Sequence, residues 1–103
     1  MDNSTFQIEV EKSFLRSKQL LNKKEKEYSE GQDRLDQFYK IAKLNSESPT
    51  QSLWGMTAKH VTSIATMVKN PTLYNLKTWR EKLTDLRNYT FLLDALLVDL
   101  EIK

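Results

Sequence analysis

The sequence LKTWREKLTDLRNYTFLLDALLVDL, residues 76–100, decides the fold of this chain. Its second half is apolar around nearly the whole circumference of a helix, and such a helix must be covered on every side. A homodimer or a larger symmetric assembly, such as a tetramer, is the first explanation for this cover. Cover of the second face by a long first helix is the alternative. The predicted oligomer interface consists of Leu93, Leu96, Leu97 and Leu100.

A polar face runs along the same segment. Glu81, Asp85 and Asn88 recur at steps of four and three residues, which places their side chains on one side of a helix. Their face continues into Leu92 and Leu96, so we expect a partly buried polar cluster. Buried carboxylates need a cation, hydrogen bonds or a proton. The opposite side carries an apolar seam at Leu76, Trp79, Leu83, Leu86, Thr90, Leu93, Leu97 and Leu100.

The rest of the chain is also predicted to be helical, because only two glycines and two prolines interrupt it. A first helix is expected to start after Ser4, where Ser4-x-x-Gln7 fits a capping box, and to run to about Tyr28. Gly31 should end it. A second, shorter helix is expected from near residue 33 to residue 44.

The third helix has the clearest start in the chain. Ser48-Pro49-Thr50-Gln51 combines an N-cap serine, a proline at the first helical position and a capping glutamine. The helix is expected to run to about residue 69, because Asn70-Pro71 stops it. The fourth helix should begin between residues 72 and 75 and continue almost to residue 103. We therefore predict a single all-α domain over residues 1–103, an up-and-down four-helix bundle.

Composition excludes several classes of protein. The chain has 16 Lys and Arg against 14 Asp and Glu, and these charges are interleaved rather than gathered in the basic stripe of a nucleic-acid-binding protein. The absence of cysteine excludes disulfides, thiolate nucleophiles and cysteine-bound zinc, and suits a reducing cytosol. No basic region followed by an apolar run opens the sequence, and no apolar stretch is long enough to span a membrane. We expect a cytoplasmic protein of a bacterial host cell that does not insert into membranes.

An acid-free stretch precedes the polar face. Between Glu47 and Glu81 there is no Asp or Glu, whereas Lys59, Lys69, Lys77 and Arg80 add positive charge. If this stretch folds against the polar face, both signs share one groove, which would suit a metal-bound phosphate. The alternative is a solvated basic face.

Glu81 and Asp85 are like charges one helical turn apart, which costs about 0.2–0.5 kcal/mol on an isolated helix unless something compensates. A divalent ion would compensate, and so would Lys77 and Lys82 as neighbours on the helix. His60 lies on the apolar stripe of the third helix, where a core histidine is more common than a ligand or base. Trp79 and the other tryptophan of the chain are most simply core anchors, although an aromatic ring near a polar groove can stack on a base.

Four short motifs together resemble a known family. They are Lys24-x-x-Glu27-Tyr28, Asp33-Arg34-Leu35-x-x-Phe38, Lys59-His60 and Trp79-x-Glu81-Lys82-x-x-Asp85-x-x-Asn88-Tyr89. The chain resembles small phage and prophage proteins related to the MazG-like, all-α nucleoside triphosphate pyrophosphohydrolases, over roughly residues 24–97. The resemblance implies a helical oligomer in which carboxylates hold Mg²⁺ against a triphosphate, and water releases a nucleoside monophosphate and pyrophosphate.

The resemblance also implies roles for individual residues. Glu81 and Asp85 match the second acidic motif as catalytic residues and metal ligands, with Asn88 as a nearby polar ligand or orienter. Glu27 or Asp33 would bring further metal-binding acids from the first two helices. The candidates for binding phosphate or nucleotide are Lys24, Arg34, Lys59 and Asn88.

The sequence also departs from the family pattern. The helix before the second acidic motif contains no acid, where the enzymes carry an acid-x-x-acid motif, and Glu81 and Asp85 are one residue further apart than usual. Two functions therefore stay open. The first is a Mg²⁺-dependent nucleoside triphosphate pyrophosphohydrolase, or a degenerate relative that only binds nucleotide. The second is a non-enzymatic helical phage protein that binds and modulates a host or defence protein.

Overall fold

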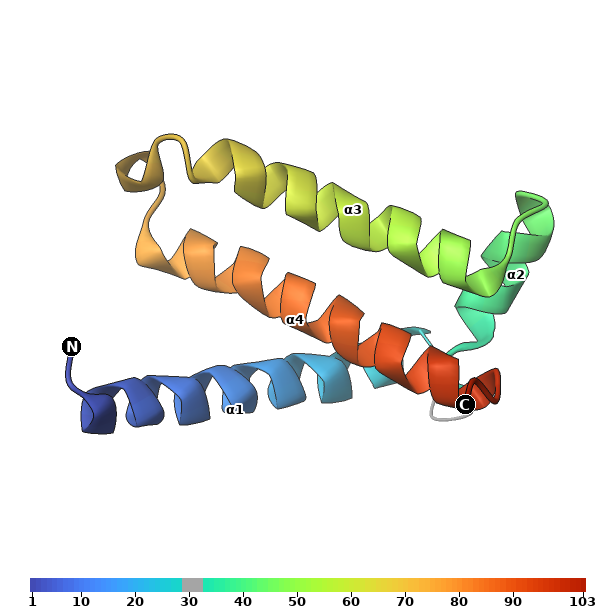
Figure 1. Ribbon diagram of the computed structural model, residues 1–103, viewed down its shortest axis with the longest axis horizontal. Coiled ribbons are helices and arrows are strands. Elements are labelled where there is room, and N and C mark those ends of the chain that lie inside the picture. Colours follow the sequence, from blue (N-terminus) through green and yellow to red (C-terminus); the bar gives the residue numbers. More distant parts are fainter. Residues whose placement is uncertain (29–32) are drawn as a thin grey trace.

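The computed structural model describes the backbone of residues 1–28 and 33–103, and the side chains of residues 1–25 and 33–103. Four α-helices follow one another: α1 (Asn3–Tyr28), α2 (Asp36–Leu44), α3 (Pro49–Met67) and α4 (Leu76–Asp99) (Figure 1). A short 3₁₀ turn, η1 (Pro71–Leu73), precedes α4. No strand occurs within these residues. The prediction of an all-α fold is confirmed.

The start of α3 has the predicted capping box. The Ser48 hydroxyl accepts a hydrogen bond from the Gln51 N–H at 3.2 Å, and the Gln51 side-chain oxygen accepts one from the Ser48 N–H at 2.8 Å. Two of the amide groups that a helix start leaves unpaired are thus satisfied, and Pro49 occupies the first turn. The start of α4 lies at Leu76, one residue beyond the predicted range, and the Asn75 side chain caps it by accepting from the Thr78 N–H at 2.8 Å.

Two other predicted helix starts were wrong. The first helix begins at Asn3 rather than after Ser4, because the Asp2 carboxylate accepts the Thr5 N–H at 2.7 Å and caps the helix. This backbone hydrogen bond also lowers the pKa of Asp2. The second helix begins at residue 36, because the Asp33 carboxylate accepts the Leu35 N–H at 2.9 Å and stabilises a turn before the helix. Gly31, predicted to end the first helix, lies outside the described residues.

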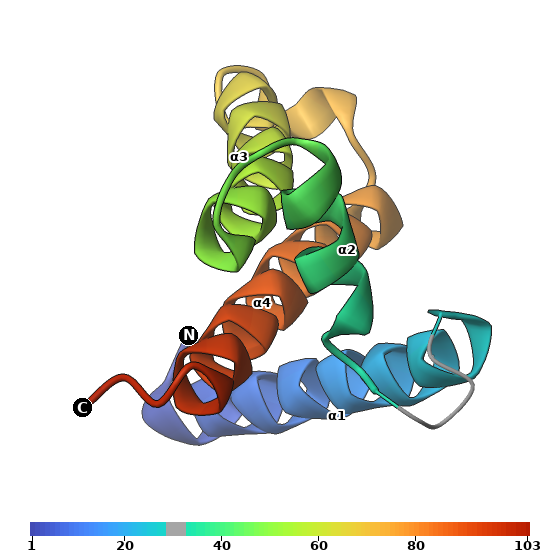
Figure 2. The ribbon, with the colours of Figure 1, turned by 90° about the vertical axis from the view of Figure 1, so that its right-hand side faces the viewer.

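The last helix occupies the middle of the molecule. It lies between α3, which runs antiparallel to it, and α1, which crosses its other side (Figure 1). Figure 2 shows α2 against the beginning of α3, at the end of the molecule where α4 finishes. The chain is elongated, with a radius of gyration of 15.6 Å, whereas a compact domain of this length has about 13 Å.

The apolar core lies where α2, α3 and α4 meet. Leu53 of α3 and Leu96 of α4 are completely buried, and Phe38 of α2 is almost so. Leu35 completes this cluster from the turn before α2. Tyr39 packs beside it and donates a hydrogen bond from its hydroxyl to the Asp99 carboxylate at 2.7 Å, which ties α2 to the end of α4. The residues packed around the cluster are Tyr39, Met56, Tyr89, Leu92, Leu93 and Leu100.

The most buried side of α4 includes part of the polar face, as expected, while Leu93 and Leu100 of the apolar seam also pack against the core. Its fully buried residues are Thr84, Asn88 and Leu96, whereas Leu76 and Leu83 of the seam are exposed. Neighbouring helices decide this orientation, because side chains from both α3 and α1 line the same cavity as Asn88. The helix surface that points away from them stays in contact with solvent.

This orientation buries part of the predicted oligomer interface within a single chain. Leu96 is covered completely within one chain, so assigning it to a subunit interface was wrong. Leu93 and Leu100 pack against the core of the same chain, and Leu97 is half-buried. The long first helix does lie against α4, as the alternative explanation for the cover expected.

Candidate functional site

A cavity of about 210 Å³ lies at the centre of the molecule, where all four helices contribute side chains. Four of the predicted site residues meet in its wall. Lys24 comes from α1, Arg34 from the turn before α2, and Asp85 and Asn88 from α4. The full lining consists of Leu20, Leu21, Lys24, Arg34, Gln37, Phe38, Met56, Asp85, Asn88, Tyr89 and Leu92. The lining thus combines apolar and aromatic side chains with polar and charged ones.

Asn88 is the most unusual member of this wall. Its side chain is only 6% exposed, and its carboxamide oxygen is buried without a hydrogen-bond partner among the described residues. Leaving a buried polar atom unpaired costs about 1–3 kcal/mol, so proteins rarely keep one without a reason. A ligand in the adjoining cavity is such a reason, because it could hydrogen-bond with this carboxamide.

Arg34 is held in place by the backbone of another helix. One of its terminal guanidinium nitrogens, Nη1, donates to the Leu21 carbonyl of α1 at 2.8 Å. This bond spans the connection between α1 and α2 and fixes the guanidinium at the cavity wall. The remaining N–H donors of an arginine fork are suited to carboxylate or phosphate oxygens.

His60, which the sequence favoured as a core histidine rather than a ligand or base, lies beside a predicted site residue. Its Nδ1 lies 3.9 Å from the Asp85 carboxylate across the α3–α4 contact, and its ring lies 4.8 Å from that of Tyr89, centre to centre. Both His60 and Asp85 are partly buried, so a proton on His60 would stabilise the carboxylate charge. The only sequence signal for this contact was the Lys59-His60 pair, since the facing of two helices cannot be read from spacing within one of them.

A larger hollow of about 550 Å³ adjoins the cavity between α1 and α4. The two share Leu20, Lys24 and Asp85, so they lie next to each other, and together they are called the depression below. Glu81 is exposed and lines only the larger part. Positive and negative side chains thus share this hollow, but α1 and α4 supply the cations, and the acid-free α3 supplies none of those that line it. The full lining of the hollow is Arg16, Leu20, Lys24, Lys77, Arg80, Glu81, Thr84 and Asp85.

Two of the predicted site residues line neither part of this depression, and a third cannot be placed. Asp33 is exposed and its carboxylate stabilises the turn before α2. Lys59 is exposed on α3 and lines neither part. Glu27 lies outside the residues whose side chains are described.

The side chains available as ligands limit how a metal ion could bind here. The described side chains contain no group of three His, Asp or Glu residues that could hold an ion. Glu81 and Asp85 remain as two carboxylates one turn apart on α4. Because Mg²⁺ is commonly held by one or two carboxylates together with substrate phosphates, this pair fits an ion that arrives bound to a phosphate chain rather than a resident one.

No protein-family model, curated protein or solved structure matches this chain. In the described part of the chain, no helix has the length and apolar character needed to cross a membrane. The function proposed below therefore depends on the chemistry of the depression itself.

If the Asn88 carboxamide binds a ligand and does not stabilise the fold, replacing Asn88 should stabilise the free protein. We expect Asn88→Leu to raise the free energy of unfolding by about 1–2 kcal/mol, because it removes an unpaired polar atom and the adjoining cavity leaves room for the larger side chain. Urea unfolding followed by circular dichroism measures this change.

Thr57→Val is the matched control for this prediction. Thr57 is equally buried, but its hydroxyl donates to the Leu53 carbonyl at 2.9 Å, so its loss should bring no gain. A destabilised Asn88→Leu protein would show that the carboxamide contributes to folding and would contradict its assignment to a ligand.

Proposed function

We propose that this protein is a Mg²⁺-dependent nucleoside triphosphate pyrophosphohydrolase of the MazG-like kind. The observation that carries the proposal is the convergence of Lys24, Arg34, Asp85 and Asn88, from three separate parts of the chain, on one cavity. Each of these residues belongs to a motif on which the family resemblance is based. An accidental depression would not be expected to collect them.

The mixed lining of the cavity suits the two parts of a nucleotide. Tyr89, which is only partly buried, offers aromatic surface on which a base can stack. The Asn88 carboxamide, together with that of Gln37, can pair with hydrogen-bonding groups of the base or sugar. Lys24 and Arg34 bring positive charge for the phosphate chain to the same cavity.

The acidic residues of α4 supply the chemistry. Glu81 and Asp85 would hold the Mg²⁺ ion that accompanies the triphosphate, and this ion would neutralise charge on the phosphate oxygens. Asp85 also lies beside His60, at 3.9 Å. Neutral His60 could accept the proton that an attacking water releases as its oxygen bonds to phosphorus, and Asp85 beside it would orient the ring. The released products would be a nucleoside monophosphate and pyrophosphate.

Hydrolysis is tested by incubating the protein with a panel of ribo- and deoxyribonucleoside triphosphates in Mg²⁺ or Mn²⁺, with monophosphate and pyrophosphate as the measured products. We expect turnover of at least one nucleotide, and a loss of about 100-fold or more in kcat for Glu81→Gln and Asp85→Asn, because each removes a carboxylate that neutralises the metal.

Glu101→Gln is the matched control, since this exposed carboxylate follows α4 and lies outside the depression. No turnover, combined with no thermal shift from nucleotide or metal, would overturn the hydrolase proposal. Turnover that survives both substitutions would place the catalytic site elsewhere.

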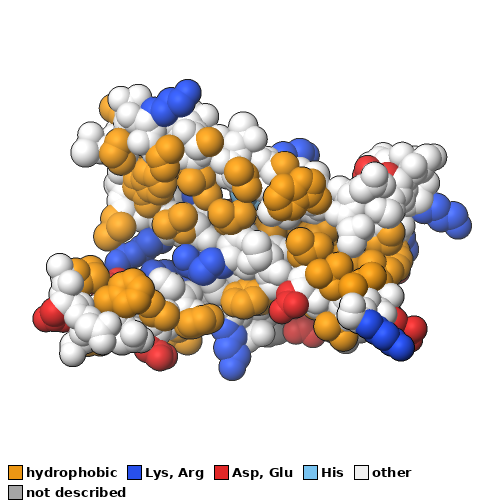
Figure 3. All heavy atoms as spheres, in the orientation of Figure 1, with side chains coloured by type: hydrophobic (Ala, Val, Ile, Leu, Met, Phe, Trp, Pro, Cys, Tyr) orange, Lys and Arg blue, Asp and Glu red, His pale blue; other side chains and the backbone are white. Residues whose placement is uncertain are grey.

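A second function, in protein interaction, is favoured by the exposed apolar surface. The chain exposes 7735 Å² at a mass of 12.1 kDa, whereas a compact monomer of this mass exposes roughly 6,000 Å². Figure 3 shows apolar side chains spread over one face of the molecule. Phe14 and Trp54 are 56% and 57% exposed. A standard interface buries roughly 800 Å² on each partner, so the excess is sufficient for one or two interfaces.

We infer that another copy of this chain covers part of this surface, and a host or defence protein is the other candidate partner. Phe6, Val10 and Phe14 line an apolar hollow on α1, beside Glu9 and Arg87. The oppositely charged pair at the rim suits a self-complementary contact, in which each copy presents both charges.

Size-exclusion chromatography with light scattering tests this assembly. We expect a mass of at least twice 12.1 kDa, and a shift to the monomer for Phe14→Glu, because a buried carboxylate in an apolar interface is strongly unfavourable. Gln19→Glu, at another exposed position of α1, should leave the mass unchanged. A monomer at all concentrations would contradict self-assembly and favour a different partner.

A further inference from the structure

The hollow between α1 and α4 carries more positive than negative charge. Four cationic residues line it, against the two carboxylates of Glu81 and Asp85. Figure 3 shows Lys and Arg side chains in the recess between the first half of α1 and the beginning of α4. Only Lys24 of these cations also reaches the central cavity. The others are Arg16 of α1 and Lys77 and Arg80 of α4.

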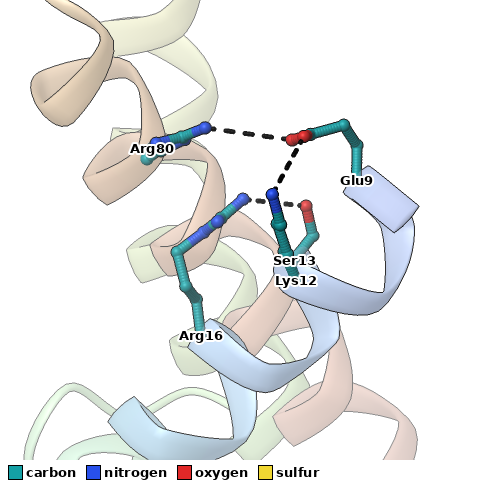
Figure 4. Close-up of polar contacts among 5 residues, drawn as sticks. All are labelled: Glu9, Lys12, Ser13, Arg16 and Arg80. Atoms are coloured by element: carbon teal, nitrogen blue, oxygen red, sulfur yellow. Dashed lines mark hydrogen bonds and ion pairs between the residues drawn. The ribbon is translucent and has the colours of Figure 1, made fainter. Parts of the chain in front are cut away.

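The charge of Arg16 lacks a carboxylate partner within the described residues. A terminal nitrogen of its guanidinium donates to the Ser13 hydroxyl at 3.0 Å, while its Nε is buried with no partner there (Figure 4). Arg87 approaches from α4 and donates to the hydroxyls of Ser17 and Thr84 at 3.1 and 3.0 Å. Burial, and next the charge of Arg16, lower the pKa of Arg87. The guanidinium groups of Arg16 and Arg87 are thus each held by hydroxyl groups and repel each other. A bound anion would reduce this repulsion.

The carboxylate nearest to Arg80 makes only a weak contact with it. Glu9 lies 3.8 Å from Arg80 and 3.6 Å from Lys12, and all three side chains are substantially exposed (Figure 4). Exposed ion pairs of this length contribute roughly 0–1 kcal/mol. A phosphate group, with more negative charge and three acceptor oxygens, can therefore replace Glu9 as the partner of Arg80.

We propose that this hollow binds a polyphosphate chain, with Arg16, Lys77 and Arg80 in contact with its phosphate oxygens. The inference rests on the proposed function and adds the direction in which the nucleotide lies. The base enters the cavity beside Asn88, Lys24 lies at the junction, and the phosphates extend along the groove between α1 and α4 past Asp85 and Glu81. The carboxylates then lie beside the phosphates rather than beside the base, where a metal on the phosphate chain would reach them.

Calorimetric titration with sodium tripolyphosphate, without any metal, tests the groove separately from catalysis. We expect the wild-type protein to bind this probe, and Arg80→Gln and Lys77→Gln each to weaken binding roughly tenfold, because each removes a charge-assisted hydrogen bond. Lys59→Gln, which removes an exposed cation outside the groove, should change binding less than twofold if attraction to net charge is small. Circular dichroism melting curves establish that each variant is folded.

Glu9→Gln provides a test of opposite sign. Because Glu9 competes with phosphate for Arg80, its neutralisation should tighten tripolyphosphate binding roughly two- to threefold. Glu11→Gln removes a carboxylate of α1 that does not line the groove, and should leave binding nearly unchanged.

The absence of tripolyphosphate binding at millimolar concentration would overturn the inference. Equal losses in the Lys59→Gln and Arg80→Gln proteins would overturn it too, since binding would then reflect net charge alone. The two proposals fail separately. Nucleotide hydrolysis with an unchanged KM in the folded Arg80→Gln and Lys77→Gln proteins would overturn the groove but leave the hydrolase. Tripolyphosphate binding that depends on the groove residues, without turnover of any nucleotide, would overturn the hydrolase proposal but leave the groove.

Discussion

The rest of the structure depends on how α4 is covered. The second half of this helix is apolar around most of its circumference, with Phe91 and Val98 still exposed to solvent, and a single neighbouring helix covers only one stripe of it. Two helices cover α4, α3 on one side and α1 on the other, and α2 covers the end where Phe38 and Leu96 meet. Both long neighbours approach the side of α4 on which Asn88 lies. Polar groups thereby become enclosed in the middle of the molecule.

Enclosure gives these polar groups their chemical character. Asn88 keeps an unpaired carboxamide oxygen, Asp85 lies beside His60, and Arg34 is fixed by a carbonyl of α1. The unpaired carboxamide oxygen of Asn88 costs free energy of folding, whereas the hydrogen bond of Arg34 and the contact of His60 with Asp85 fix the positions of side chains at the cavity wall. A costly polar atom beside side chains that are held in place is typical of a site that a ligand completes. We interpret the depression from Asn88 to Arg80 as one site.

Local features could be predicted well from the sequence. The capping box at Ser48 and Gln51 and the cap at Asn75 depend on side chains within a few residues of the backbone that they satisfy. The first helix was placed less well, because Asp2 and Ser4 are both good caps and the sequence does not show which one the backbone uses. Asp33 was similarly ambiguous, since a carboxylate can cap a helix or stabilise a turn in front of it.

The candidate site could be predicted only in part. Spacing showed that Glu81, Asp85 and Asn88 share a face, but not that this face points inward at Asn88 while Glu81 stays exposed. That difference depends on where α1 crosses α4, which no local pattern records. Two further features could not be predicted for the same reason. The position of Arg16 in the hollow and the contact of His60 with Asp85 both depend on helices that are distant in sequence.

The central claim is that the enclosed polar face of α4 is a nucleotide site. A titration of isotope-labelled protein with Mg²⁺ and a non-hydrolysable nucleoside triphosphate analogue tests it most directly, through the NMR signals of the Asn88 carboxamide and the Arg34 guanidinium. Both signals should move along saturable curves with the same dissociation constant, while the carboxamide of Asn70, exposed at the far end of α3, stays unchanged. Signals of Asn88 and Arg34 that do not respond to any of the common nucleotide analogues at millimolar concentration would contradict the account.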